Sequence, residues 1–165
     1  MTASASIVAV FMSACIAPDV EVIGALGVTV DQSARPVLVV EACDGAAILV
    51  TLSYNREGLA DDEENEDIAS WTSVEPVVGM SELVLHSPSA PWQGEGIDLP
   101  YDRGYIAGGQ GEGDKQVLSQ VAFSGAQLTE MLPGTIYRND PDHGVTALVP
   151  HTPAEFTAEI CSRGT

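Results

Sequence analysis

Three cysteines, Cys15, Cys43 and Cys161, are the residues of this chain whose chemistry is the most distinctive. Thiols form disulfides, bind metals and are modified, and an odd number in an exported protein requires a separate explanation for one of them. None of the three belongs to a C-x-x-C pattern, so their spacing does not indicate a zinc or redox motif. We therefore expect one modified cysteine and one pair.

Cys15 stands within an apolar run, residues 7–17, that has the length of a signal-peptide core. Its eleven residues are too few for a membrane-spanning helix, which needs about 20. The run contains Met12-Ser13-Ala14-Cys15, which resembles the lipobox at which a signal peptidase cleaves before a lipidated cysteine. Met12 replaces the commoner leucine, and residues 1–6 lack Lys and Arg, so we expect translation to start upstream. Cys15 is therefore the predicted lipid attachment site.

This interpretation divides the chain into a signal-peptide-like segment (1–14), a tether (15–23) and a single β-rich extracytoplasmic domain (24–165). Two alternatives stay open for the apolar run: a buried first strand with Cys15 in the core, and ordinary secretion. If Cys15 carries lipid, Cys43 and Cys161 remain in an oxidising compartment, and they are predicted to form a disulfide. The alternative is two buried free thiols.

Other polar residues do not fall into a catalytic or metal-binding pattern. The three histidines, His86, His143 and His151, are not spaced as metal ligands, and G-x-S-x-G is absent. Residues 139–144 lack the closing Glu of an EF-hand loop. The glycines of residues 108–114 precede no Lys-Ser/Thr, so they predict a flexible loop and not a phosphate site. We predict no catalytic residue, no metal site and no cofactor.

The charge balance is strongly acidic, with 24 acidic against six basic residues and a net charge of −18. Such a field repels nucleic acids and anionic headgroups, so nucleic-acid binding is excluded from the expected functions. Six of the seven residues in 61–67 are acidic, which predicts a mobile loop outside the core. The alternative for this loop is a site for calcium or for a basic partner.

Short aliphatic and β-branched runs separated by turn residues predict a mainly β fold. Asp44-Gly45 predicts a hairpin, and 127–132 predicts one helical turn. Thr152-Pro153-Ala154-Glu155 is a capping box that predicts a C-terminal helix. We expect an antiparallel β-sandwich or barrel-like domain with this short helix. The expected strands are 24–30, 37–43, 46–54, 71–75, 80–85, 103–107, 116–123, 135–138 and 145–149.

The order of these features resembles the small, uncharacterised predicted lipoproteins of actinobacteria. The matching pieces are residues 12–15, 27–30, 35–40 and 43–45, and a terminal helix with Glu155-Phe156 and Cys161. The resemblance implies a small secreted β-rich domain on the extracytoplasmic face of the cell membrane, and it implies no activity.

Together these features predict a monomeric, non-catalytic binding or interaction domain, held to the membrane by a lipid anchor, with an unidentified protein or cell-envelope partner. Two other functions stay open. One is a small secreted hydrolase or inhibitor. The other is a cytoplasmic β-domain whose apolar start has been misassigned.

Overall fold

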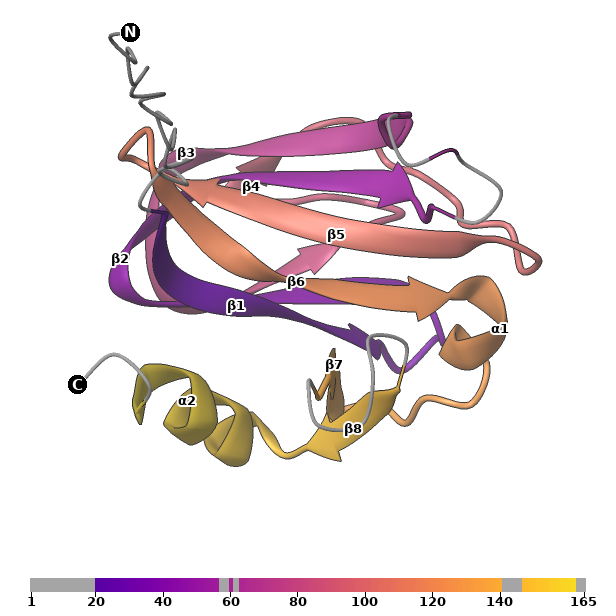
Figure 1. Cartoon of the computed structure of the whole chain (residues 1–165). Helices are drawn as coiled ribbons and strands as arrows, with labels where there is room; N and C mark the ends of the chain where they lie inside the picture. The colour runs from indigo at the N-terminus through magenta and orange to yellow at the C-terminus, as the bar shows by residue number, and fades with distance from the viewer. Residues whose placement is uncertain (1–19, 57–59, 61–62, 141–146, 163–165) are drawn as a thin grey trace, which may run out of the picture.

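The computed structural model describes residues 20–56, 60, 63–140 and 147–162. Of the described residues, 56% lie in strands and 11% in helices, so the prediction of a mainly β, barrel-like domain with a short C-terminal helix is confirmed (Figure 1). The elements are β1 (Glu21–Val30), β2 (Pro36–Tyr54), β3 (Asp67–Val84), β4 (Trp92–Gln93), β5 (Gly104–Gly111), β6 (Gln116–Ser124), α1 (Gly125–Leu128), β7 (Ile136–Asn139), β8 (Leu148–His151) and α2 (Pro153–Ser162).

Four strands, β1, β2, β5 and β6, form a closed barrel. Strand β2 pairs with β1 and with β5, β5 pairs with β6, and β6 returns to β1. The β1–β6 pairing is parallel, whereas the other pairings within the barrel are antiparallel. Strands β3 and β4 extend the sheet from β2, and β7 and β8 extend it from β1 (Figure 1).

The predicted hairpin at Asp44-Gly45 is wrong, because β2 runs through it as one strand from Pro36 to Tyr54. Up to Ala42 this strand pairs with β1, and from Ala47 onward it pairs with β5. The register with β3 also shifts between these two residues. A glycine inside a strand often marks a bend at a barrel corner, and here the two halves pair with different neighbours and not with each other.

The first hairpin forms instead at residues 31–35, between the expected strands 24–30 and 37–43. The Asp31 carboxylate accepts hydrogen bonds from the backbone N–H of Ser33 (2.8 Å) and Arg35 (3.0 Å). Its other oxygen lies 2.6 Å from the Arg35 guanidinium. The hydrogen bond from the Arg35 side chain, followed by those from the backbone, lowers the pKa of Asp31 below its ordinary value. These bonds fix the turn between β1 and β2.

Two further predictions are corrected by strand pairing. Residues 71–75 and 80–85 were expected to form separate strands. Instead, β3 runs without interruption from Asp67 to Val84, and within it only Gly79 has a positive φ. The predicted loop 108–114 is part of β5 as far as Gly111. At Gly109 an added Cβ would lie 2.6 Å from Leu118 Cδ1. Close packing, and not loop flexibility, therefore favours glycine there.

The acidic segment is only partly as expected. Residues 61–62 lie outside the described residues, and Glu63 and Glu64 are exposed and irregular. The Glu66 carbonyl, however, accepts a hydrogen bond from the Tyr54 N–H (3.0 Å), and Asp67 begins β3. Asp67 also accepts a hydrogen bond from Ser53 Oγ at 2.5 Å. The end of the predicted loop therefore belongs to the sheet, because strand pairing satisfies its backbone groups.

Both helices begin at capping boxes. At α1 the Gln127 N–H donates to Ser124 Oγ, and the Gln127 side chain accepts from the Ser124 N–H.

Strand β1 begins at Glu21, and Ile23 is fully buried. The sheet therefore starts before the expected Gly24.

The main hydrophobic core is mostly aliphatic, with a few large aromatic residues whose polar groups are hydrogen-bonded. Trp71 Nε1 donates to the Glu95 carbonyl (3.0 Å), and Trp92 Nε1 donates to Ser81 Oγ (3.1 Å). The Tyr105 hydroxyl donates to the Pro100 carbonyl (2.8 Å), and burial raises its pKa to about 12. Strands β1 and β2 are buried on their outer face as well, and this outer face carries the site described next.

Barrel closure predicts a strong contrast between two glycine substitutions. At Gly24 an added Cβ would overlap the Glu41 carbonyl of β2, whereas at Gly108 it would lie 3.4 Å from the flexible Gln120 side chain. We expect Gly24→Ala to lower the free energy of unfolding by about 3 kcal/mol, because backbone must move, and Gly108→Ala to change it by less than about 1 kcal/mol. Urea denaturation measures both. Equal effects would contradict the proposed close approach of β1 and β2.

Candidate functional site

The candidate site is the contact between α2 and the outer face of β1 and β2 (Figure 1). Phe156 and Ile160, four residues apart on one helix face, are buried against the sheet. Gly27 lies beneath the Phe156 ring, since an added Cβ there would be 3.3 Å from two ring atoms. The complete apolar cluster is Ala25, Val39, Ile136, Phe156 and Ile160. We call this cluster, with the polar contacts described next, the α2 clamp.

A disulfide joins Cys43, at the corner of β2, to Cys161, in the last turn of α2. The two Cα atoms lie 5.3 Å apart, and the residues are separated by 118 positions in the sequence. The predicted pairing is therefore confirmed. The bond fixes the end of the helix to the point at which β2 changes partner.

Glu41 lies beneath the same part of α2 with only 2% of its surface exposed. Thr157 Oγ1 donates a hydrogen bond to Glu41 Oε2 at 2.5 Å, and Glu41 Oε1 lies 3.9 Å from Cys161 Sγ. Sequence reasoning missed this residue. The available signal was an acidic residue ending the apolar run of residues 37–40, in a strand that is buried on both faces.

The ligand atoms of Glu41, Cys43 and Cys161 lie within 4.8 Å of one another, which is close enough for a metal site. The sulfur atoms are bonded to each other, however, so neither is a thiolate that could bind a metal. The neighbouring carboxylate and the negative end of the helix dipole both disfavour a thiolate here. Because thiolates carry out disulfide exchange, this arrangement protects the bond and serves a structural role.

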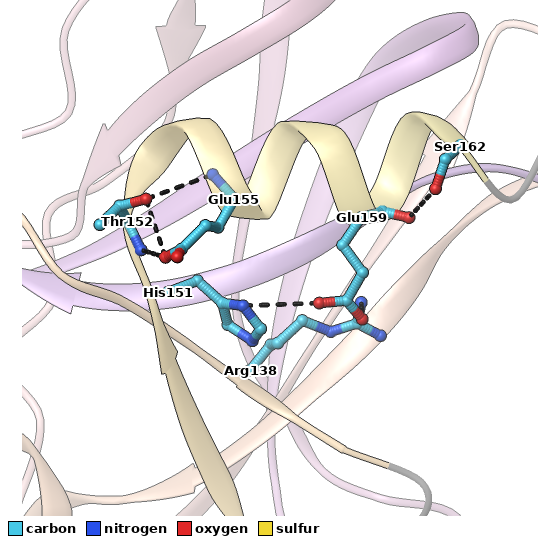
Figure 2. A network of polar contacts seen from close by, with 6 residues as sticks. All are labelled: Arg138, His151, Thr152, Glu155, Glu159 and Ser162. Atoms are coloured by element: carbon cyan, nitrogen blue, oxygen red, sulfur yellow. Dashed lines mark hydrogen bonds and ion pairs between the residues drawn. The ribbon is translucent and has the colours of Figure 1, made fainter.

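A second polar contact connects α2 with β7 and β8 (Figure 2). Arg138 is 8% exposed, and its Nη1 lies 3.0 Å from Glu159 Oε1. His151 Nδ1 lies 3.4 Å from Glu159 Oε2, so one carboxylate contacts both strands. Arg138 also lines a cavity of about 120 Å³ together with Cys43 and Ile160. Through their contacts with Glu159, Arg138 and His151 orient the helix on the sheet.

The start of α2 is held by the predicted capping box (Figure 2). The Glu155 carboxylate accepts hydrogen bonds from the Thr152 N–H and Oγ1, both at 2.8 Å, and the Glu155 N–H donates to Thr152 Oγ1. The backbone bond, followed by the hydroxyl bond, lowers the pKa of Glu155. The helix is thus fixed at its first turn, its middle and its last turn.

Of the remaining sequence candidates, His86 is described, and it is not brought into the α2 clamp. Cys15 and His143 lie outside the described residues. His86 Nδ1 lies 2.8 Å from Asp98 Oδ1, but both side chains are exposed, which makes this a solvated surface pair. Within the described part of the chain, no helix is long and apolar enough to span a membrane.

Comparison of the chain with models of protein families, with curated proteins and with solved structures finds no match.

The disulfide generates a stability prediction. In the Cys43→Ala/Cys161→Ala double variant we expect the free energy of unfolding to fall by on the order of 4–5 kcal/mol, because the bond closes a very long loop. A ten-residue helix has little stability of its own, so the α2 amides should also exchange hydrogen faster than those of β1. Denaturation and hydrogen exchange measure these effects. A loss below about 1 kcal/mol would show that the bond is not needed.

The buried carboxylate generates a double-mutant prediction. We expect Thr157→Val to destabilise the protein by about 3 kcal/mol, because it leaves the Glu41 carboxylate buried without its hydroxyl donor. Adding Glu41→Leu should recover most of the loss, since both polar partners are then replaced by apolar groups. Chemical denaturation of the two single variants and the double variant provides the cycle. Additive losses would mean that the two residues do not interact.

Proposed function

We propose that this chain is the extracytoplasmic domain of a membrane-anchored lipoprotein and acts there as a non-catalytic binding domain. The observation that carries the proposal is the Cys43–Cys161 disulfide. Structural disulfides persist in oxidising compartments and are rare in the cytosol. This bond therefore favours an exported protein over a cytoplasmic domain with a misassigned start.

The position of β1 supports a short tether. Residues 16–20 separate Cys15 from the start of β1 at Glu21. Even fully extended, such a segment spans no more than about 20 Å. In the proposed arrangement, the end of the barrel at which β1 begins therefore lies next to the membrane, and the end of α2 that bears Cys161 lies at the same end (Figure 1).

The charge at this end supports a covalent anchor. Glu21, Asp44 and Glu112 are all exposed there, around the start of β1, the corner of β2 and the end of β5. Acidic groups near an anionic bilayer are repelled, so electrostatic attraction could not hold the domain at the surface. A multiply acylated cysteine holds a protein firmly without such attraction. The proposal therefore assigns membrane attachment to Cys15 alone.

The anchor is tested with Cys15→Ala in the protein expressed from its native locus. We expect the wild-type protein in the membrane fraction and the variant in the soluble extracytoplasmic fraction, because the lipid is its only attachment. Immunoblots of the separated fractions measure the distribution. The matched control, Cys43→Ala/Cys161→Ala, should remain with the membrane although it lacks the disulfide. Retention of Cys15→Ala in the membrane would contradict the anchor.

A further inference from the structure

Three side chains of the α2 clamp bring their ligand atoms together at the corner of β2. Glu41 and Cys43 are two residues apart on this strand, so they share one of its faces. Thr157 and Cys161 are four residues apart on α2, so they share a face of the helix. The ligand atoms of Glu41, Cys43 and Cys161 all lie within 4.8 Å of one another. We call these three residues the corner triad.

Glu41 is an acidic side chain that is buried without a counterion. It is 2% exposed, and none of the Lys, Arg and His residues that the structure describes forms an ion pair with it. Burial of a carboxylate without a positive partner is costly, and the single hydroxyl donor of Thr157 offsets only part of this cost. A cation bound beside Glu41 would remove the rest.

The two oxygens of the Glu41 carboxylate have different surroundings. Oε2 accepts the hydrogen bond from Thr157 Oγ1 at 2.5 Å, whereas Oε1 lies 3.9 Å from Cys161 Sγ. Carboxylates that bind metals are commonly held by an outer hydrogen bond of this kind, which orients the oxygen that contacts the metal. Thr157 therefore orients Glu41 with Oε1 toward the sulfur atoms.

While the disulfide is intact its sulfur atoms are not metal ligands, but reduction leaves two thiols in the same place. Two sulfur atoms bound to a tetrahedral Zn²⁺ at about 2.3 Å lie about 3.8 Å apart, and a sulfur and a carboxylate oxygen about 3.5 Å apart. The 3.9 Å distance from Glu41 Oε1 to Cys161 Sγ is already close to the second value. Because the two cysteine Cα atoms are 5.3 Å apart, rotation of the side chains supplies the first.

We propose that the corner triad of the reduced chain binds Zn²⁺ through the thiolates of Cys43 and Cys161 and through Glu41 Oε1. Thiolate ligands suit Zn²⁺, whereas Ca²⁺ and Mg²⁺ take oxygen ligands. Both cysteines are only half-buried, so a water molecule completes the tetrahedron. This inference goes beyond the proposed function and does not depend on the lipid anchor.

The disulfide and the metal are alternative closures of the same corner. A dithiol reductant supplies two electrons and two protons, which convert the disulfide into two thiols while the reductant becomes a disulfide. Metal binding then releases the two thiol protons to water. In the reverse direction an external disulfide takes two electrons from the thiolates, the Cys43–Cys161 bond forms again, and the cation is released.

The test uses the full-length Cys15→Ala chain, in which the two cysteines of the corner triad are the only ones left. The chain is reduced with a phosphine, and Co²⁺ serves as the probe because its visible absorption reports tetrahedral coordination by thiolates. We expect the reduced chain to bind one equivalent of Co²⁺ and Zn²⁺ to displace it. Equally tight Co²⁺ binding by the oxidised chain would place the metal elsewhere and overturn the proposal.

Two matched variants test the ligand set. Glu41→Gln keeps the shape of the side chain but removes the third ligand, and it should weaken Zn²⁺ binding by at least about tenfold. Asp44→Asn removes an exposed charge next to Cys43, and it should change binding by less than about twofold. In the oxidised chain Glu41→Gln should not lower the melting temperature, because it removes a buried charge. Unchanged Zn²⁺ binding in Glu41→Gln would contradict the assignment of Glu41.

Hydrogen exchange separates binding at the folded corner from binding by an unfolded chain. Reduction should speed the exchange of the α2 amides, and Zn²⁺ should restore their protection because it again joins the helix to β2. Zn²⁺ binding without restored protection would overturn the proposed site. Because the chain used here carries no lipid, such a failure would leave the membrane-fraction test of Cys15 unaffected.

Discussion

Strand β2 is the element on which the rest of the structure depends, because it changes partner between Ala42 and Ala47. Its first half pairs with β1 and its second half with β5, so the four-strand ring closes only if β2 bends at this point. Gly24 allows β1 to pass close to the Glu41 carbonyl just before the bend. The bend also places Cys43 and Glu41 on the outer face, where α2 packs. Barrel closure and helix attachment therefore share one corner.

The attachment of α2 turns a short helix into a fixed part of the domain. A ten-residue helix has little intrinsic stability, and here it gains contacts along its whole length. Its first turn is capped by Glu155, its apolar face is buried through Phe156, and its last turn is bonded to Cys43. These contacts cover the outer face of β1 and β2, which explains why both strands are buried on two sides although the chain has few aromatic residues.

Local signals in the sequence predicted the parts of this structure that depend on local chemistry. The capping box at Thr152 and the even pair of cysteines left after Cys15 both gave correct predictions. Asp44-Gly45 was misread because a turn sequence cannot show which strands pair on either side of it, and that choice is set by barrel closure. Glu41 was missed for a related reason. Whether a buried polar group has a partner depends on residues that are distant in the sequence.

The central claim is that the domain is exported, oxidised and anchored through Cys15. Intact-mass analysis of the native protein from the membrane fraction tests all three parts directly. The account predicts a chain that begins at Cys15 and carries acyl groups, and whose mass rises by two hydrogens when the Cys43–Cys161 bond is reduced. An unlipidated chain that retains residues 1–14 and whose mass does not change on reduction would contradict it.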